Sequence, residues 1–160
     1  MKNDVARDIS YATSASGLMG QLLIRSIENI TGRIGLINRA KDYDIEVAKG
    51  RNFWEVIVER YNIEMNMVKG CLKDIPTEGP VVIVSNHPFG ILDGLLMGYI
   101  LSKTRKDFKI IANRVFRKAK DLDNVVLPIS FEENRDGNLQ NIKTRNEAID
   151  FLKAGGIVGI

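Results

Sequence analysis

Residues 81–94 read Val-Val-Ile-Val-Ser-Asn-His-Pro-Phe-Gly-Ile-Leu-Asp-Gly, and the rest of the chain is arranged around this stretch. Its β-branched first part predicts a strand, and the helical pattern that begins near Leu95 predicts a helix. Between them lies His87, the single histidine of the chain, with Asp93 further along. Ligands bind at the carboxyl ends of strands in open α/β sheets, so His87 is a candidate reagent and Asp93 its candidate partner.

The two side chains form a pair that suits proton transfer. An ordinary neutral imidazole, with a pKa of about 6.5, accepts a proton from a hydroxyl or amine, and a carboxylate on its other nitrogen stabilises the resulting cation. Pro88 and Gly90 disfavour a continuous helix from His87, so a loop can fold back and bring it to Asp93. On spacing alone a second interpretation stays open, in which the histidine is structural and the aspartate only complements the helix dipole.

The motif Asn-His-Pro-Phe-Gly-Ile-Leu-Asp-Gly at 86–94, preceded by Ile75-Pro76 and the run 79–84, resembles the first motif of the lysophospholipid acyltransferase superfamily. This resemblance implies that His87 and Asp93 are the catalytic dyad. The superfamily usually has four residues between them, whereas this chain has the five residues 88–92. That spacing resembles the hemolysin-like acyltransferases, the branch that includes ornithine-lipid acyltransferases.

The resemblance also implies a reaction, a set of site residues and a glycerolipid acyltransferase-like fold. We expect transfer of a fatty acyl group from coenzyme A or acyl carrier protein to a hydroxyl or amine of a lipid precursor, without a cofactor. Around the dyad we expect a supporting loop formed by Asn86, Pro88, Phe89, Gly90 and Gly94. Its glycines are expected to allow the turn and the close approach of the backbone. We expect Asn86 to order the loop, to help hold an oxyanion, or to be a turn asparagine that bonds its own backbone. Phe89 is expected either to form a wall of the acyl site or to pack, and packing is favoured. The chain is expected to be the front portion of the domain, incomplete before a Phe-Pro-x-Gly loop.

Two other functions stay open. In the first, the chain is a non-catalytic module that binds a membrane surface or a carrier protein, and the dyad is structural. In the second, Ser85 is the nucleophile of a serine hydrolase, although the chain lacks the Gly-x-Ser-x-Gly elbow that exposes such a serine.

Positive charge is concentrated after the motif, while the net charge is only +3. A cluster of lysines and arginines over 103–120 predicts a surface for anions, such as lipid head groups, coenzyme A phosphates or an acidic carrier protein. Within it, Arg114 and Arg117, together with Asn113, are the predicted contacts for a substrate anion because they follow the next strand. No recognised nucleic-acid motif occurs, so nucleic acid is not an expected partner.

Composition excludes several other classes of protein. With 160 residues, 44% hydrophobic and 27% charged, the chain suits one globular domain. One cysteine and one histidine leave no internal disulfide and no cluster with metal-ligand spacing. Neither a signal peptide nor a membrane-spanning run is predicted, so we expect a cytoplasmic protein in peripheral contact with the inner face of the membrane.

Hydrophobic periodicity predicts a helical segment over 1–62 that packs on the front portion of an α/β domain over 63–160, as one domain overall. Strands that alternate with helices predict a mostly parallel sheet flanked by helices. The expected strands lie at 63–67, 81–85, 108–112, 125–131 and 156–160. The expected helices lie at 19–37, 53–61 and 95–102, with a last one that Asn138 caps and whose inward face includes Leu139 and Ile142.

Overall fold

The computed structural model of the protein describes residues 10, 12 and 15–160. Its internal contacts separate two compact units, 1–62 and 63–160, and each is described by itself. The first unit is helical, with α2 at Leu18–Glu28, the π-helical turn η2 at Asn29–Arg33, α3 at Ile34–Arg39, α4 at Tyr43–Ala48 and α5 at Phe53–Tyr61. Packing of this unit on the second one stays a prediction.

Local sequence explains where the helices of the first unit begin and break. The helix expected over 19–37 is interrupted at Gly32, whose φ of 112° is not helical. The α5 helix begins as expected, because the Asn52 side chain accepts the Trp54 and Glu55 amide N–H groups at 2.9 and 3.3 Å. Trp54 is buried, as its place on the apolar face of α5 predicts.

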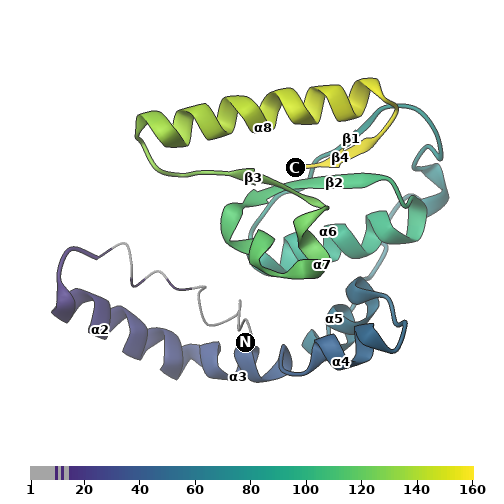
Figure 1. The fold of residues 1–160 in the computed structure, drawn as a ribbon. Coiled ribbons are helices and arrows are strands. Elements are labelled where there is room, and N and C mark those ends of the chain that lie inside the picture. Colours follow the sequence, from purple (N-terminus) through teal and green to yellow (C-terminus); the bar gives the residue numbers. More distant parts are fainter. Residues whose placement is uncertain (1–9, 11, 13–14) are drawn as a thin grey trace. The chain divides into compact units, whose positions relative to one another are not determined.

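The second unit is built on a parallel sheet of four strands in the order β1-β4-β2-β3. Figure 1 shows α8 along one face of this sheet and α6 and α7 along the other. The prediction of an α/β fold with a parallel sheet flanked by helices is therefore confirmed. In chain order the elements are η3 at Leu72–Asp74, β1 at Val81–Ile83, α6 at Ile91–Thr104, β2 at Phe108–Asn113, η4 at Arg114–Lys118, α7 at Lys120–Asp123, β3 at Val126–Ile129, α8 at Arg135–Lys153 and β4 at Ile157–Gly159.

The two faces of the sheet pack against their helices in different ways. Under α8, a core forms from the buried Leu127, Ala148 and Val158, with Phe151 against it. On the other face α6 lies very close to β4, since a Cβ at Gly159 would come within 2.3 Å of the Met97 sulfur. Gly159 thus sets how close α6 approaches the sheet.

The strand expected over 63–67 is absent from the described chain, and this prediction is wrong. Its alternating pattern is real, but Met65 and Met67 are exposed. A strand needs a neighbour for its backbone N–H and C=O groups, and no described segment pairs with it.

The last helix starts earlier than expected and presents a different face. Asn134, not Asn138, caps α8, and its side chain accepts the Gly137 amide N–H at 2.7 Å. Leu139 and Ile142 are exposed, contrary to expectation. Polar contacts to β3 decide which face is inward, through hydrogen bonds from Thr144 to the Pro128 carbonyl and between the Asn141 side chain and the Ser130 backbone.

Arg105 joins the amino ends of three neighbouring strands. Its guanidinium donates to the carbonyl of Gly79 before β1 at 2.7 Å and to that of Gly155 before β4 at 2.6 Å. It also forms a two-pronged pair with Asp107, just before β2. The side chain is 6% exposed, so this residue of the predicted basic cluster is a structural one.

We expect Arg105→Gln to lower the urea midpoint for unfolding of the second unit by roughly 1 M, because two carbonyls lose a charged donor. Circular dichroism during urea titration measures this. Arg145→Gln, at an exposed position on α8, is the matched control and should leave the midpoint nearly unchanged. Equal midpoints for the two variants would show that the Arg105 contacts do not hold the strands together.

The same pair predicts a pH dependence. Hydrogen bonding from Arg105 holds the pKa of Asp107 below its ordinary value of 3.8. Near that pH the unfolded chain binds more protons than the folded one, so stability rises with pH there and is lost as pH falls through the lowered pKa. Asp107→Asn should reduce stability at pH 7 and flatten its decline between pH ~5 and ~2. Urea midpoints measured across this range test it, and Asp121→Asn should keep the original slope.

Candidate functional site

A short loop connects the carboxyl end of β1 to the start of α6. Beyond the end of β1, backbone pairing with β4 continues to Ser85, whose N–H donates to the Ile160 carbonyl at 3.1 Å. The chain then turns, with the Gly90 N–H directed at the His87 carbonyl at 3.5 Å. Gly90 is the residue immediately before α6, so the segment between strand and helix is very short. The expected strand–loop–helix arrangement is present.

This loop brings the two predicted catalytic side chains together. His87 Nδ1 lies 3.7 Å from Asp93 Oδ2, and the imidazole is 66% exposed while the carboxylate is 17% exposed. The same Oδ2 accepts the Phe89 amide N–H at 2.7 Å. Asp93 lies in the first turn of α6, where a negative charge also complements the helix dipole. At 3.7 Å the contact between His87 and Asp93 is longer than a hydrogen bond.

The exposure and the backbone conformation of the remaining residues of the supporting loop fit the expected roles for some of them only. Asn86, Pro88 and Phe89 are all exposed, so the expectation that Phe89 packs is wrong for the described chain. Gly90 has a φ of 60°, which explains a glycine at this turn. At Gly94 a Cβ would meet no described atom within 4 Å, so close backbone approach does not explain that glycine.

The predicted anion contacts lie at the same edge of the sheet as the dyad. Asn113 ends β2 and Arg114 begins η4, and parallel strands bring their carboxyl ends to one edge. β4 separates β1 from β2, which places the two loops two strand spacings apart, roughly 10 Å.

Both arginines have carboxylate partners that sequence reasoning missed. Arg114 pairs with Glu132 at 2.5 Å, from the loop after β3, and Arg117 pairs with Asp123 at 2.9 Å, from α7. All four side chains are about half exposed or more, so these pairs exchange readily with other ions. The basic stretch is therefore partly neutralised by acids from elsewhere in the fold. No pattern within 103–120 could have revealed Glu132.

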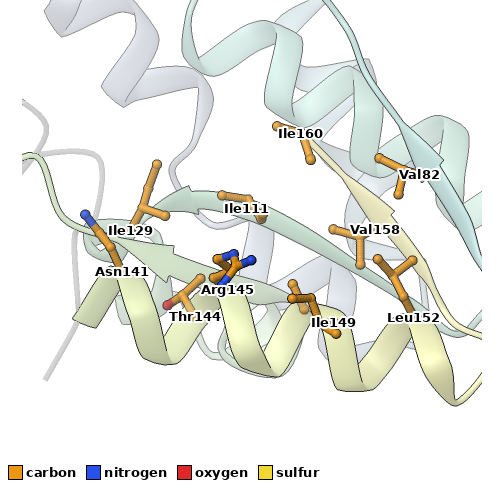
Figure 2. Close-up of a pocket in the computed structure, with 11 residues that line it drawn as sticks. Val82, Ile111, Ile129, Asn141, Thr144, Arg145, Ile149, Leu152, Val158 and Ile160 are labelled. Atoms are coloured by element: carbon orange, nitrogen blue, oxygen red, sulfur yellow. The ribbon is translucent and has the colours of Figure 1, made fainter. Parts of the chain in front are cut away.

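A separate apolar hollow lies between α8 and the sheet, with a volume of about 260 Å³. It exists because α8 leaves part of β1 uncovered, and Val82 is 48% exposed. Figure 2 shows Arg145 among the surrounding apolar side chains. None of the residues that line it belongs to the loop 86–94, and its lining includes Val82, Ile111, Val158, Ile160, Ile149 and Leu152.

In the described part of the chain, no group of histidine, cysteine and acidic residues has an arrangement that could hold a metal ion. Cys71 is exposed. None of the described helices combines the length and the apolar character that crossing a bilayer requires.

Comparison with known proteins finds two curated relatives. A lyso-glycine lipid O-acyltransferase of Bacteroides thetaiotaomicron is 30% identical over 118 residues, which are 73% of this chain and 36% of that protein. A protein of the same name from Phocaeicola vulgatus is 30% identical over 105 residues, which are 65% of this chain and 33% of that protein. The chain thus spans about a third of the length of the curated relatives it matches.

No protein-family model matches the chain, and no solved structure matches it. The two relatives support the resemblance to lipid acyltransferases in general.

Proposed function

We propose that the protein is an acyltransferase that moves a fatty acyl group from a thioester, on coenzyme A or acyl carrier protein, to a lipid precursor in membrane lipid biosynthesis. The observation that supports this most is the approach of Asp93 to His87 Nδ1, at 3.7 Å, in an exposed loop at a strand end. Both relatives are named O-acyltransferases. A hydroxyl acceptor therefore has more support than an amine.

The proposed reaction uses the outer face of the imidazole. Because Nδ1 faces Asp93, the exposed Nε2 of His87 takes the proton of the acceptor hydroxyl as its oxygen attacks the thioester carbonyl carbon. Asp93 stabilises the imidazolium that forms. The carbon–sulfur bond then breaks, and the thiolate leaves and recovers the proton from His87. The products are an ester and a free thiol, whose pKa of about 8.5 makes its thiolate a fair leaving group.

Other residues receive supporting roles in this proposal. Asn86 precedes His87 in the exposed loop, where its amide N–H₂ group can hold the developing oxyanion. Arg114 and Arg117, with Asn113 beside them, contact the phosphates of the donor or the acceptor. An anion at these arginines must displace Glu132 and Asp123, which makes this binding weak in the absence of further contacts.

The geometry gives no support to a serine hydrolase. In the described chain no hydrogen bond links the Ser85 hydroxyl to His87, and the Ser85 backbone pairs with Ile160. Direct transfer without an acyl-enzyme is the simpler mechanism for this loop.

We also propose peripheral contact with an anionic membrane, at its cytoplasmic face. The α2 helix supports this contact because it exposes large apolar side chains on neighbouring turns, namely Leu18, Met19, Leu22, Leu23 and Ile27. Exposed apolar residues on one helical face are typical of helices that lie in a lipid interface. The arginines after β2 add electrostatic attraction to anionic lipids.

If the dyad is catalytic, His87→Ala in the full-length protein should lower the transfer rate by at least roughly 10³-fold, and Asp93→Asn by roughly 10²-fold or more. Thiol release from an acyl thioester in the presence of a lyso-lipid measures both. Ser85→Ala is the matched control from the same strand end and should keep most activity.

Intact-mass measurement during turnover should find no acyl group on the protein. An adduct on Ser85 would instead establish the two-step hydrolase mechanism. Near-normal transfer by correctly folded His87→Ala and Asp93→Asn would exclude the dyad. Absence of any transfer, together with specific membrane binding, would favour the non-catalytic binding module.

Charge should contribute to binding of the membrane. Association with vesicles that contain anionic lipid should weaken from 0.1 M to 1 M salt, since the screening length falls from about 10 Å to about 3 Å. Reversal of Arg114 and Arg117 to glutamate should remove most of this salt dependence. Reversal of Lys41 and Lys49, which are exposed in the first unit, should leave most of it, as vesicle sedimentation would show.

Equal weakening by both pairs of reversals would contradict a localised anion-binding face. Binding that survives high salt would point to the apolar side chains of α2. In that case Leu23→Ser should weaken sedimentation with vesicles more than Ser26→Ala on the same helix does.

A further inference from the structure

The turn at Gly90 has an unusual backbone conformation. Its φ is 60° and its ψ is −117°, which is the mirror image of the extended region that L-residues adopt. A Cβ at this position would meet no described atom within 4 Å. Space therefore does not require a glycine here, and the backbone conformation does.

Gly90 sets the direction of the loop relative to α6. On its amino-terminal side the Phe89 N–H donates to Asp93 Oδ2 at 2.7 Å. On its carboxyl-terminal side α6 begins, with the Asp93 N–H donating to the Gly90 carbonyl at 3.2 Å. The donor and the acceptor of the Phe89–Asp93 hydrogen bond are thus joined through Gly90, so its φ and ψ decide whether they meet.

We propose that Gly90 is a positioning residue that acts through Asp93. Its turn directs the Phe89 N–H at the Asp93 carboxylate and fixes Oδ2 opposite Nδ1 of His87. The carboxylate then favours the tautomer of His87 that carries its proton on Nδ1. This geometric inference stands by itself, while its consequence for acyl transfer rests on the proposed function.

The tautomer matters because only an unprotonated Nε2 can accept a proton on the exposed side of the ring. If the Phe89–Asp93 hydrogen bond is lost, the carboxylate is free to adopt other rotamers and no longer selects Nδ1–H. A fraction of the protein would then carry the proton on Nε2 and would be unable to act as a base there. Gly90 thus controls the protonation pattern of His87 without touching a substrate.

The single histidine of the chain makes a direct test possible. With ¹⁵N-labelled histidine, the ring nitrogen spectrum at a pH where the imidazole is neutral should show protonated Nδ1 and unprotonated Nε2. Gly90→Ala should shift the population measurably toward protonated Nε2. Gly70→Ala is the matched control, because Gly70 also has a positive φ, 83°, and its Cβ would make only an ordinary contact at 3.9 Å. The Gly70→Ala protein should give the same ring nitrogen spectrum as the unsubstituted protein.

A residue of opposite chirality at position 90 distinguishes a requirement for this backbone conformation from a requirement for backbone flexibility. A D-alanine at position 90, introduced by ligation at Cys71, favours the same mirror-image conformation and should retain protonated Nδ1. This variant also keeps the test decisive if Gly90→Ala fails to fold. A folded D-alanine protein with a predominantly protonated Nε2 would overturn the inference, as would a folded Gly90→Ala protein with the original spectrum.

Kinetics provides the second readout in the full-length protein. Gly90→Ala should lower kcat at least roughly tenfold, part of the roughly 10²- to 10⁴-fold that a positioned base contributes, with little change in KM. In the Asp93→Asn background it should cause no further loss, because both changes remove the same effect. Additive losses would overturn the inference. A Gly90-dependent tautomer in a protein without transfer activity would support this inference while the proposed function failed.

Discussion

The arrangement of the second unit depends on one buried guanidinium, that of Arg105. It binds the carbonyls of Gly79 and Gly155 and the carboxylate of Asp107, which lie immediately before three strands adjacent in the sheet. Because the strands are parallel, holding their amino ends level also fixes their register. The register decides where each strand ends, and therefore where the loop 86–90 stands relative to the loops after β2 and β3.

The other determinant of the site is the close packing of α6. Gly159 lets Met97 approach β4, and Met97 lies one turn after Asp93 on the same face of α6. This contact holds the helix that carries Asp93 against the sheet. His87 comes from the strand side of the loop and Asp93 from the helix side. Their meeting is thus a result of strand register and helix packing together.

Electrostatics at the carboxyl edge of the sheet cannot be inferred from the count of basic residues. Arg105 is buried at the opposite edge, beside the amino ends of the strands, whereas Arg114 and Arg117 are exposed at the carboxyl edge and each faces a carboxylate from a different element. An anion that binds to these two arginines must therefore compete with their carboxylate partners.

The sequence by itself determined the order of strands and helices from residue 81 onward, the parallel sheet, the helix start at Asn52 and the short loop that places His87 near Asp93. These features follow from periodicity and from caps and turns, which act over a few residues. Tertiary structure alone decided the strand order, the burial of Arg105, the acidic partners of the arginines, the absence of a strand at 63–67 and the inward face of α8. Each of these depends on which distant segment supplies a hydrogen bond, a charge or a packing surface, and hydrophobic periodicity contains no information about distant partners.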